Sequence, residues 1–117
     1  MNNGLFSQHP GVYVSPLIPL TTALAYSVPH NLGSRHLRAE WRFVCLEPNN
    51  GYIAEDEVEV NGWGGFIATT RINPYSAALF PSSSLLGVSF TNTSGTAQFQ
   101  PTAAQWALRC RVQTILP

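Results

Sequence analysis

Residues 28–60, VPHNLGSRHLRAEWRFVCLEPNNGYIAEDEVEV, contain the clearest structural pattern in this chain. Within them, residues 37–46 alternate between apolar and charged side chains, which is the period of a β-strand with one buried face. The buried face would carry Leu37, Ala39, Trp41, Phe43 and Cys45, and the other face Arg38, Glu40 and Arg42. A Pro-Asn-Asn-Gly turn at 48–51 ends this strand, and a short acidic strand is predicted at 58–60.

A second long strand, at 106–116, repeats this pattern. It places Trp106, Leu108, Cys110 and Val112 on one face and Arg109, Arg111 and Gln113 on the other. The two strands would be neighbours in one sheet or would face each other across a sandwich. Further strands are predicted at 22–28, 65–72, 85–91 and 97–100, whereas 75–80 fits either a strand or a turn of helix. Since helical periodicity is lacking, the sequence predicts an all-β fold, an antiparallel β-sandwich.

The first twenty residues, MNNGLFSQHPGVYVSPLIPL, differ from the rest. Prolines at positions 10, 16 and 19 exclude a helix or a central strand there. The segment is nevertheless richer in apolar side chains than a disordered tail. We therefore predict an extended Pro-rich N-terminal arm over 1–20 and a β-sandwich domain over 21–117. The arm would bury its apolar side chains on its own domain or on a neighbouring chain.

Charged residues make up only 10% of the 117 residues, against about 25% in an average globular protein, and every basic residue is arginine. Such a surface suits a protein that packs against copies of itself or other proteins, although a GC-rich genome would also favour arginine over lysine. The net charge of zero gives no reason to expect nucleic-acid binding, and no apolar run is long enough for membrane insertion. No signal peptide is visible, so we expect Cys45 and Cys110 to be reduced and buried.

Acidic residues gather in one segment, and arginines lie on the outward faces of the two long strands. We expect ion pairs between strands or between subunits that involve Arg38, Glu40, Arg42, Arg109, Arg111, Glu55, Asp56, Glu57 and Glu59. The acidic segment lacks the Asp/Asn–Gly pattern of a calcium loop, and the histidines are scattered, so no metal site is predicted. In an alternative interpretation, the arginines bind a sugar acid or a phosphate.

Three aromatic residues near predicted turns, Trp63, Tyr52 and Tyr75, are candidates for contact with a glycan or a partner protein. Ordinary packing is the alternative for each of them. No GxSxG, HExxH, P-loop or GxGxxG motif is present, and Asp56 is the only aspartate. We therefore predict no enzymatic activity, no catalytic residue and no cofactor.

The order of these features resembles small β-domains of bacteriophage virion proteins. In that pattern a His-x-Leu-Gly turn precedes a strand with a cysteine near its end, and Gly-Tyr and an acidic Asp-Glu-Val follow. The matching residues are His30, Leu32, Gly33, Cys45, Gly51, Tyr52, Asp56, Glu57 and Val58. The nearest likeness is to tail-fibre and head- or tail-appendage proteins, some of them similar to the H-type lectin sandwich.

The resemblance implies a bacteriophage structural protein of the virion, assembled in the host cytoplasm. It implies a homo-oligomer, a trimer or hexamer, whose N-terminal arm would dock to another virion protein. One alternative is a carbohydrate- or receptor-binding tail module that contacts a host surface glycan. Another is a capsid decoration protein. The resemblance carries over no catalytic residue.

Overall fold

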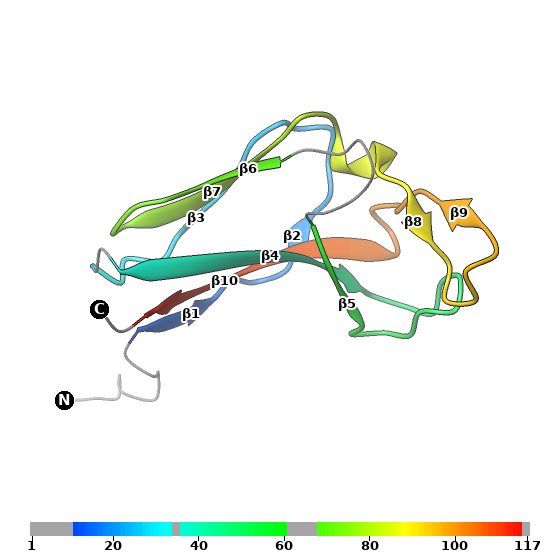
Figure 1. The fold of residues 1–117 in the computed structure, drawn as a ribbon, viewed down its shortest axis with the longest axis horizontal. Helices are drawn as coiled ribbons and strands as arrows, with labels where there is room; N and C mark the ends of the chain where they lie inside the picture. The colour runs from blue at the N-terminus through cyan, green and yellow to red at the C-terminus, as the bar shows by residue number, and fades with distance from the viewer. Residues whose placement is uncertain (1–10, 34–35, 61–67, 116–117) are drawn as a thin grey trace.

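Strands account for almost all of the regular structure. The computed structural model describes residues 11–33, 36–60 and 68–115. In these ranges the strands are β1 (Val12–Val14), β2 (Ile18–Pro19), β3 (Tyr26–Pro29), β4 (Leu37–Cys45), β5 (Glu57–Glu59), β6 (Ala68–Ile72), β7 (Ser76–Pro81), β8 (Phe90–Thr91), β9 (Gln98–Phe99) and β10 (Trp106–Thr114). The only helix in the same ranges is one 3-10 turn, η1 (Leu85–Gly87). The all-β prediction is therefore confirmed (Figure 1).

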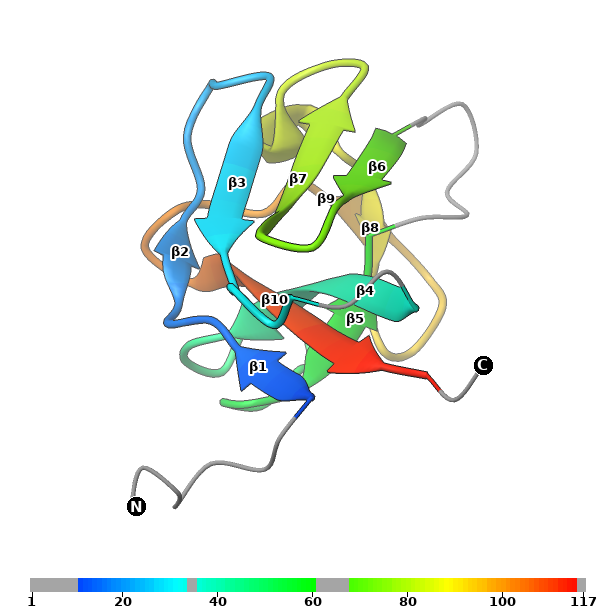
Figure 2. The ribbon, with the colours of Figure 1, turned by 90° about the vertical axis from the view of Figure 1, so that its left-hand side faces the viewer.

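The strands form two antiparallel sheets and a short ribbon. The first sheet has the order β1–β10–β4–β5, with β2 also paired to β10. The second sheet has the order β3–β7–β6, and β8 pairs with β9 in a separate ribbon. Figures 1 and 2 show the second sheet lying over the first. This arrangement is the antiparallel sandwich expected from the sequence.

Alternate side chains of the two sheets build the core. β4 and β10 are neighbours in one sheet, with Trp41 opposite Cys110 and Cys45 opposite Trp106. These four side chains point inward and are at most 5% exposed. The second sheet contributes Tyr26, Val28, Ala77 and Leu79 to the same core. The predicted inward faces of both long strands are thus confirmed.

A tight turn lies in the connection between β4 and β5. Asn50 and Gly51 both have positive φ, 53° and 93°, which is the geometry of a type I′ turn. Asn49 and Tyr52 flank the turn and exchange two backbone hydrogen bonds of 2.9 Å. The Asn49 side chain also accepts a hydrogen bond from the indole Nε1 of Trp106 at 3.0 Å. The turn is therefore fastened to the core residue that starts β10.

The described part of the predicted arm forms an edge of the first sheet. β1 and β2 both pair with β10, but their registers differ by one residue, which marks a β-bulge between them. The buried Ser15 lies at this bulge. Its N–H donates to the Cys110 carbonyl, and its Oγ accepts from the Cys110 N–H, both at 2.9 Å. Residues 12–19 therefore pack on their own domain, whereas residues 1–10 lie outside the described ranges.

The prediction of a strand over 85–91 is wrong for its first half. Ser84 Oγ accepts a hydrogen bond from the Leu86 N–H at 3.2 Å and starts η1 instead. As a result the buried residues are Leu85, Val88 and Phe90, spaced by three and then by two. Only Phe90–Thr91 remains a strand, β8.

The strand predicted at 22–28 begins later than expected, because β3 starts at Tyr26. The Ala23 N–H donates to Thr21 Oγ1 at 3.1 Å, so a local side-chain turn occupies the preceding residues. The ambiguous stretch 75–80 is a strand, since β7 covers Ser76–Pro81. The other predicted strands lie at β4, β5, β6, β9 and β10 with shifted ends, and residues 65–67 are outside the described ranges.

His30 joins two turns at one end of the sandwich. Its ring is buried, and Nδ1 accepts from the Leu32 N–H at 3.0 Å. With Nδ1 as acceptor, Nε2 carries the proton and donates to the Asn73 carbonyl at 2.9 Å. The turn after β3 is thereby tied to the turn between β6 and β7. The His-x-Leu-Gly sequence has a structural role here.

Candidate functional site

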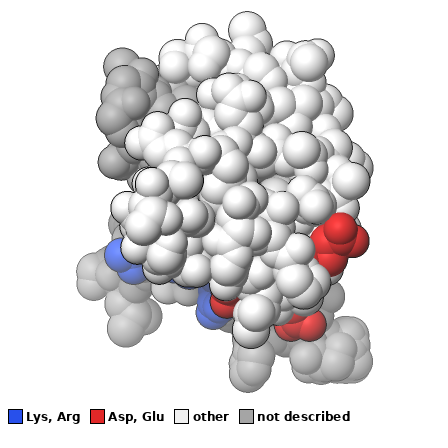
Figure 3. Space-filling view, turned by 90° about the vertical axis from the view of Figure 1, so that its right-hand side faces the viewer, with Lys and Arg blue, Asp and Glu red and all other residues white. Residues whose placement is uncertain are grey.

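Charge is concentrated on one side of the molecule. The chain has six arginines and six acidic residues, and all except Arg35 lie in the described ranges. Of these eleven, only Arg71 on β6 lies outside β4, β5, β10 and the β4–β5 connection. Figure 3 shows the result, a broad face almost without charged atoms, with red and blue near its lower edge. A site built from charged side chains is therefore expected on the outer face of the first sheet.

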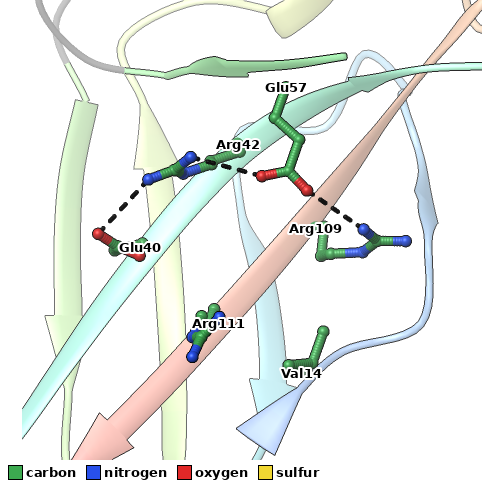
Figure 4. A pocket seen from close by; sticks show the side chains of 6 residues that line it. All are labelled: Val14, Glu40, Arg42, Glu57, Arg109 and Arg111. Carbon is green, nitrogen blue, oxygen red and sulfur yellow. Dashed lines mark hydrogen bonds and ion pairs between the residues drawn. The ribbon is translucent and has the colours of Figure 1, made fainter. Parts of the chain in front are cut away.

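At the centre of this outer face, Arg42 on β4 is the direct cross-strand partner of Arg109 on β10. Like charges in this position repel each other. Glu57 on β5 lies between them, with Oε1 3.4 Å from Arg42 Nη1 and Oε2 3.3 Å from Arg109 Nη1. Glu40 lies 3.6 Å from the other terminal nitrogen of Arg42. Figure 4 shows this chain of contacts across three strands.

These side chains line a shallow pocket of about 200 Å³. Its walls are formed by Val14, Glu40, Arg42, Glu57, Arg109 and Arg111. Val14 comes from β1 and is half exposed, so it adds an apolar wall beside the arginines. The three guanidinium groups of this lining are donors that suit the binding of an anion.

Two arginines at the pocket have donors without acceptors. Arg109 Nε is buried and has no hydrogen-bond partner. Arg111 is exposed and forms no ion pair with any residue in the described ranges, although Glu40 is its cross-strand partner. The lining itself has three guanidinium groups and two carboxylates. The pocket therefore offers both charge and free donors to an anion.

The structure brings together five of the nine residues predicted to form ion pairs, namely Glu40, Arg42, Glu57, Arg109 and Arg111, at this one pocket. Arg38 lies further along β4, opposite Gln113. Asp56 is used locally, because its carboxylate accepts from the Ile53 N–H at 2.9 Å. Glu55 is exposed with φ of 77° in the β4–β5 connection, and Glu59 is the cross-strand partner of Arg42. Sequence reasoning missed Val14 as a site residue, because Val12-Tyr13-Val14 is apolar throughout and does not show which side chains face outward.

The three candidate aromatic residues have different environments. Tyr52 packs edge-on against Trp106, with ring centroids 5.3 Å apart, and its hydroxyl donates to the Thr91 carbonyl at 2.7 Å. Tyr52 therefore packs inside its own domain, which was the alternative to its contacting a glycan or a partner protein. Tyr75 is 66% exposed beside β7 and remains a candidate contact. Trp63 lies outside the described ranges.

Comparison with known proteins leaves the family open. No family model, curated protein or solved structure matches the chain. The site must therefore be interpreted from its own chemistry.

Both cysteines are unbonded and buried in the core. Burial raises the pKa of the Cys110 thiol to about 12. Burial also raises the pKa of Cys45, whose Sγ donates a hydrogen bond to the Glu47 carbonyl at 3.0 Å. Among the described residues, no group of three or more metal-binding side chains is found. No helix in those same ranges is long and apolar enough to cross a membrane.

Proposed function

We propose that this chain is a structural protein of a bacteriophage virion. In this proposal the β-sandwich forms a homo-oligomer in the tail or in a head or tail appendage. The observation that supports it best is the concentration of charge on one sheet, because Arg71 is the only charged residue in the described strands of the other sheet. An uncharged surface loses little hydration energy when a neighbouring subunit covers it.

The outer face of the β3–β7–β6 sheet is the proposed assembly face. Phe80 on β7 points away from the core and is 40% exposed. Its neighbours on the same face include Thr69 and Ser27, which are uncharged and exposed, and Arg71 on β6 is the one charged residue on this face of the described strands. Among the described strands, β3 and β6 each have only one hydrogen-bonded neighbour, so both edges have backbone groups available to another subunit.

Light scattering with size-exclusion chromatography tests this assembly. The expected result is a multiple of the 12.8 kDa chain mass at micromolar concentration. Phe80→Glu should reduce that mass, because it places a charge on the proposed face. Ile53→Glu is the matched control, since Ile53 is 64% exposed but lies in the β4–β5 connection. A monomeric wild-type chain, or equal effects of the two variants, would contradict the proposed face.

The proposed docking of the arm now rests on residues 1–10, because residues 12–19 pair with β10. Deletion of residues 1–10 is expected to leave the sandwich folded and to prevent its incorporation into particles. Circular dichroism would check the fold, and sedimentation with assembled particles would check incorporation. Unchanged incorporation would show that these residues are not the anchor.

A glycan-binding role in a tail module is the second candidate, and the exposure of Tyr75 favours it. An aromatic ring at the surface can stack on a sugar ring. On a glycan array, Tyr75→Ala should lose the signal while Tyr52→Phe keeps it. An array without any signal for the wild-type chain would count against this role.

A further inference from the structure

We propose that the pocket between β1, β4, β5 and β10 binds a carboxylate group from an acidic side chain of a neighbouring protein chain. This inference rests on the proposed assembly role and names the chemistry of one contact. Three guanidinium groups and two carboxylates line the pocket, so the arginine N–H donors outnumber the carboxylate acceptors of the lining. Arginine binds carboxylates through paired N–H donors in a planar fork, which gives this ligand class its specificity.

Arg111 is the main anchor in this arrangement. Glu57 already contacts Arg42 and Arg109 on its two oxygens, and Glu40 contacts Arg42. Arg111 has no such partner within the described ranges, and Figure 4 shows it projecting from β10 between Glu40 and Val14. A carboxylate at Arg111 would have the methyl groups of Val14 beside it, where the methylene groups of a glutamate side chain could pack.

Arg109 provides a second reason for an external ligand. Its buried Nε has no acceptor, and a buried donor without an acceptor is unfavourable. A small rotation of the guanidinium group toward a bound carboxylate would give this donor a partner. A bound carboxylate would therefore satisfy a donor that no described residue satisfies.

An acidic protein side chain fits the pocket better than a sugar acid. The pocket lining lacks an aromatic side chain on which a sugar ring could stack. At about 200 Å³ the pocket has room for a small side-chain group.

Nuclear magnetic resonance of the full chain tests the proposal through the arginine Nε–H signals. The probe is N-acetyl-glutamate N-methylamide, with the glutamine analogue as its uncharged match. The glutamate probe should shift the Arg109 and Arg111 signals in a saturable way, and the glutamine analogue should not. Arg111→Gln should weaken binding about tenfold, as expected for the loss of one charge-assisted contact. Arg71→Gln, on β6 of the other sheet, should leave binding unchanged.

Glucuronate provides the third arm of the titration. Binding of glucuronate without binding of the glutamate probe would overturn the assignment to a protein side chain. Equal shifts with the glutamine analogue, or unchanged affinity in Arg111→Gln, would overturn the carboxylate site itself. The mass measured for Phe80→Glu tests assembly through the other sheet, so failure here is distinguishable from failure of the proposed function.

Discussion

Arg42 and Arg109 are direct cross-strand partners, and the carboxylate of Glu57 contacts both of them. Glu57 on β5 lies where β4 and β10 bring the two arginines together, and its negative charge offsets their repulsion. The ion pairs themselves are about one-third exposed, so each contributes at most about 1 kcal/mol. The main effect of Glu57 is to offset the repulsion.

Glu57→Gln is expected to destabilise the fold by about 1 kcal/mol, because it leaves the two arginines facing each other without a counter-charge. Urea denaturation measures this change. Arg109→Gln in the Glu57→Gln background should recover part of the loss, and added salt should diminish it through screening. Glu55→Gln is the matched control, since Glu55 is exposed and forms no ion pair with any other described residue. An equal loss in the control would refute the explanation.

Trp106→Phe is expected to destabilise the protein by about 1 kcal/mol more than Trp41→Phe. Both residues lie on the inner face of the first sheet, but only the Trp106 Nε1 has a hydrogen-bond acceptor, Asn49 Oδ1. The Trp41 Nε1 is buried without a partner, so phenylalanine removes an unsatisfied donor there. Thermal unfolding of the two variants gives the comparison. A larger loss for Trp41→Phe would contradict the assigned hydrogen bond.

Ser15→Ala is expected to cost about 1–3 kcal/mol, because it removes the acceptor for the buried Cys110 N–H. Ser27→Ala, at an exposed position of β3, should change stability by less than about 0.5 kcal/mol. Chemical denaturation would provide both values. Hydrogen exchange at the Cys110 amide should also accelerate in Ser15→Ala, and unchanged protection at that amide would argue against the bulge hydrogen bond.

Stability is expected to fall between pH 9 and about pH 12 because of Cys110. Its pKa rises from 9.0 to about 12 on burial, so the folded state keeps the proton over a range in which the unfolded state releases it. The contribution is therefore complete below pH 9 and is lost as pH rises toward the folded value. Urea titrations across this range should show a shallower decline for Cys110→Ala than for the wild type. Parallel declines would mean that Cys110 is not the responsible group.

The sandwich could be predicted from the sequence because Trp41 and Cys110 lie in segments of period-2 alternation, 37–43 and 108–113. That alternation needs only a pleated strand with one buried face, and both conditions are local. The start of η1 was not predictable in the same way, because one hydrogen bond from Ser84 replaces strand pairing over the next residues. Local competition of this kind leaves no periodic signal.

The candidate site could be predicted only in part. The charges of Arg42, Arg109 and Glu57 indicated ion pairing, but the meeting of all three depends on the register of β4 with both neighbours. Val14 reaches the pocket because β1 pairs with β10, a partner far along the chain. Tyr52 follows a turn, where sequence suggested exposure, but the type I′ geometry directs it onto Trp106.

The central position of β10 also bears on how the protein is made. Ser15 hydrogen-bonds to Cys110 across 95 residues of chain, and β4 pairs with the same strand from the other side. The β4–β5 pair can form early, but β1 and β2 cannot join the first sheet until this late segment has emerged from the ribosome. The dominance of such distant pairings favours slow folding, and the waiting strands would be open to association with other nascent copies.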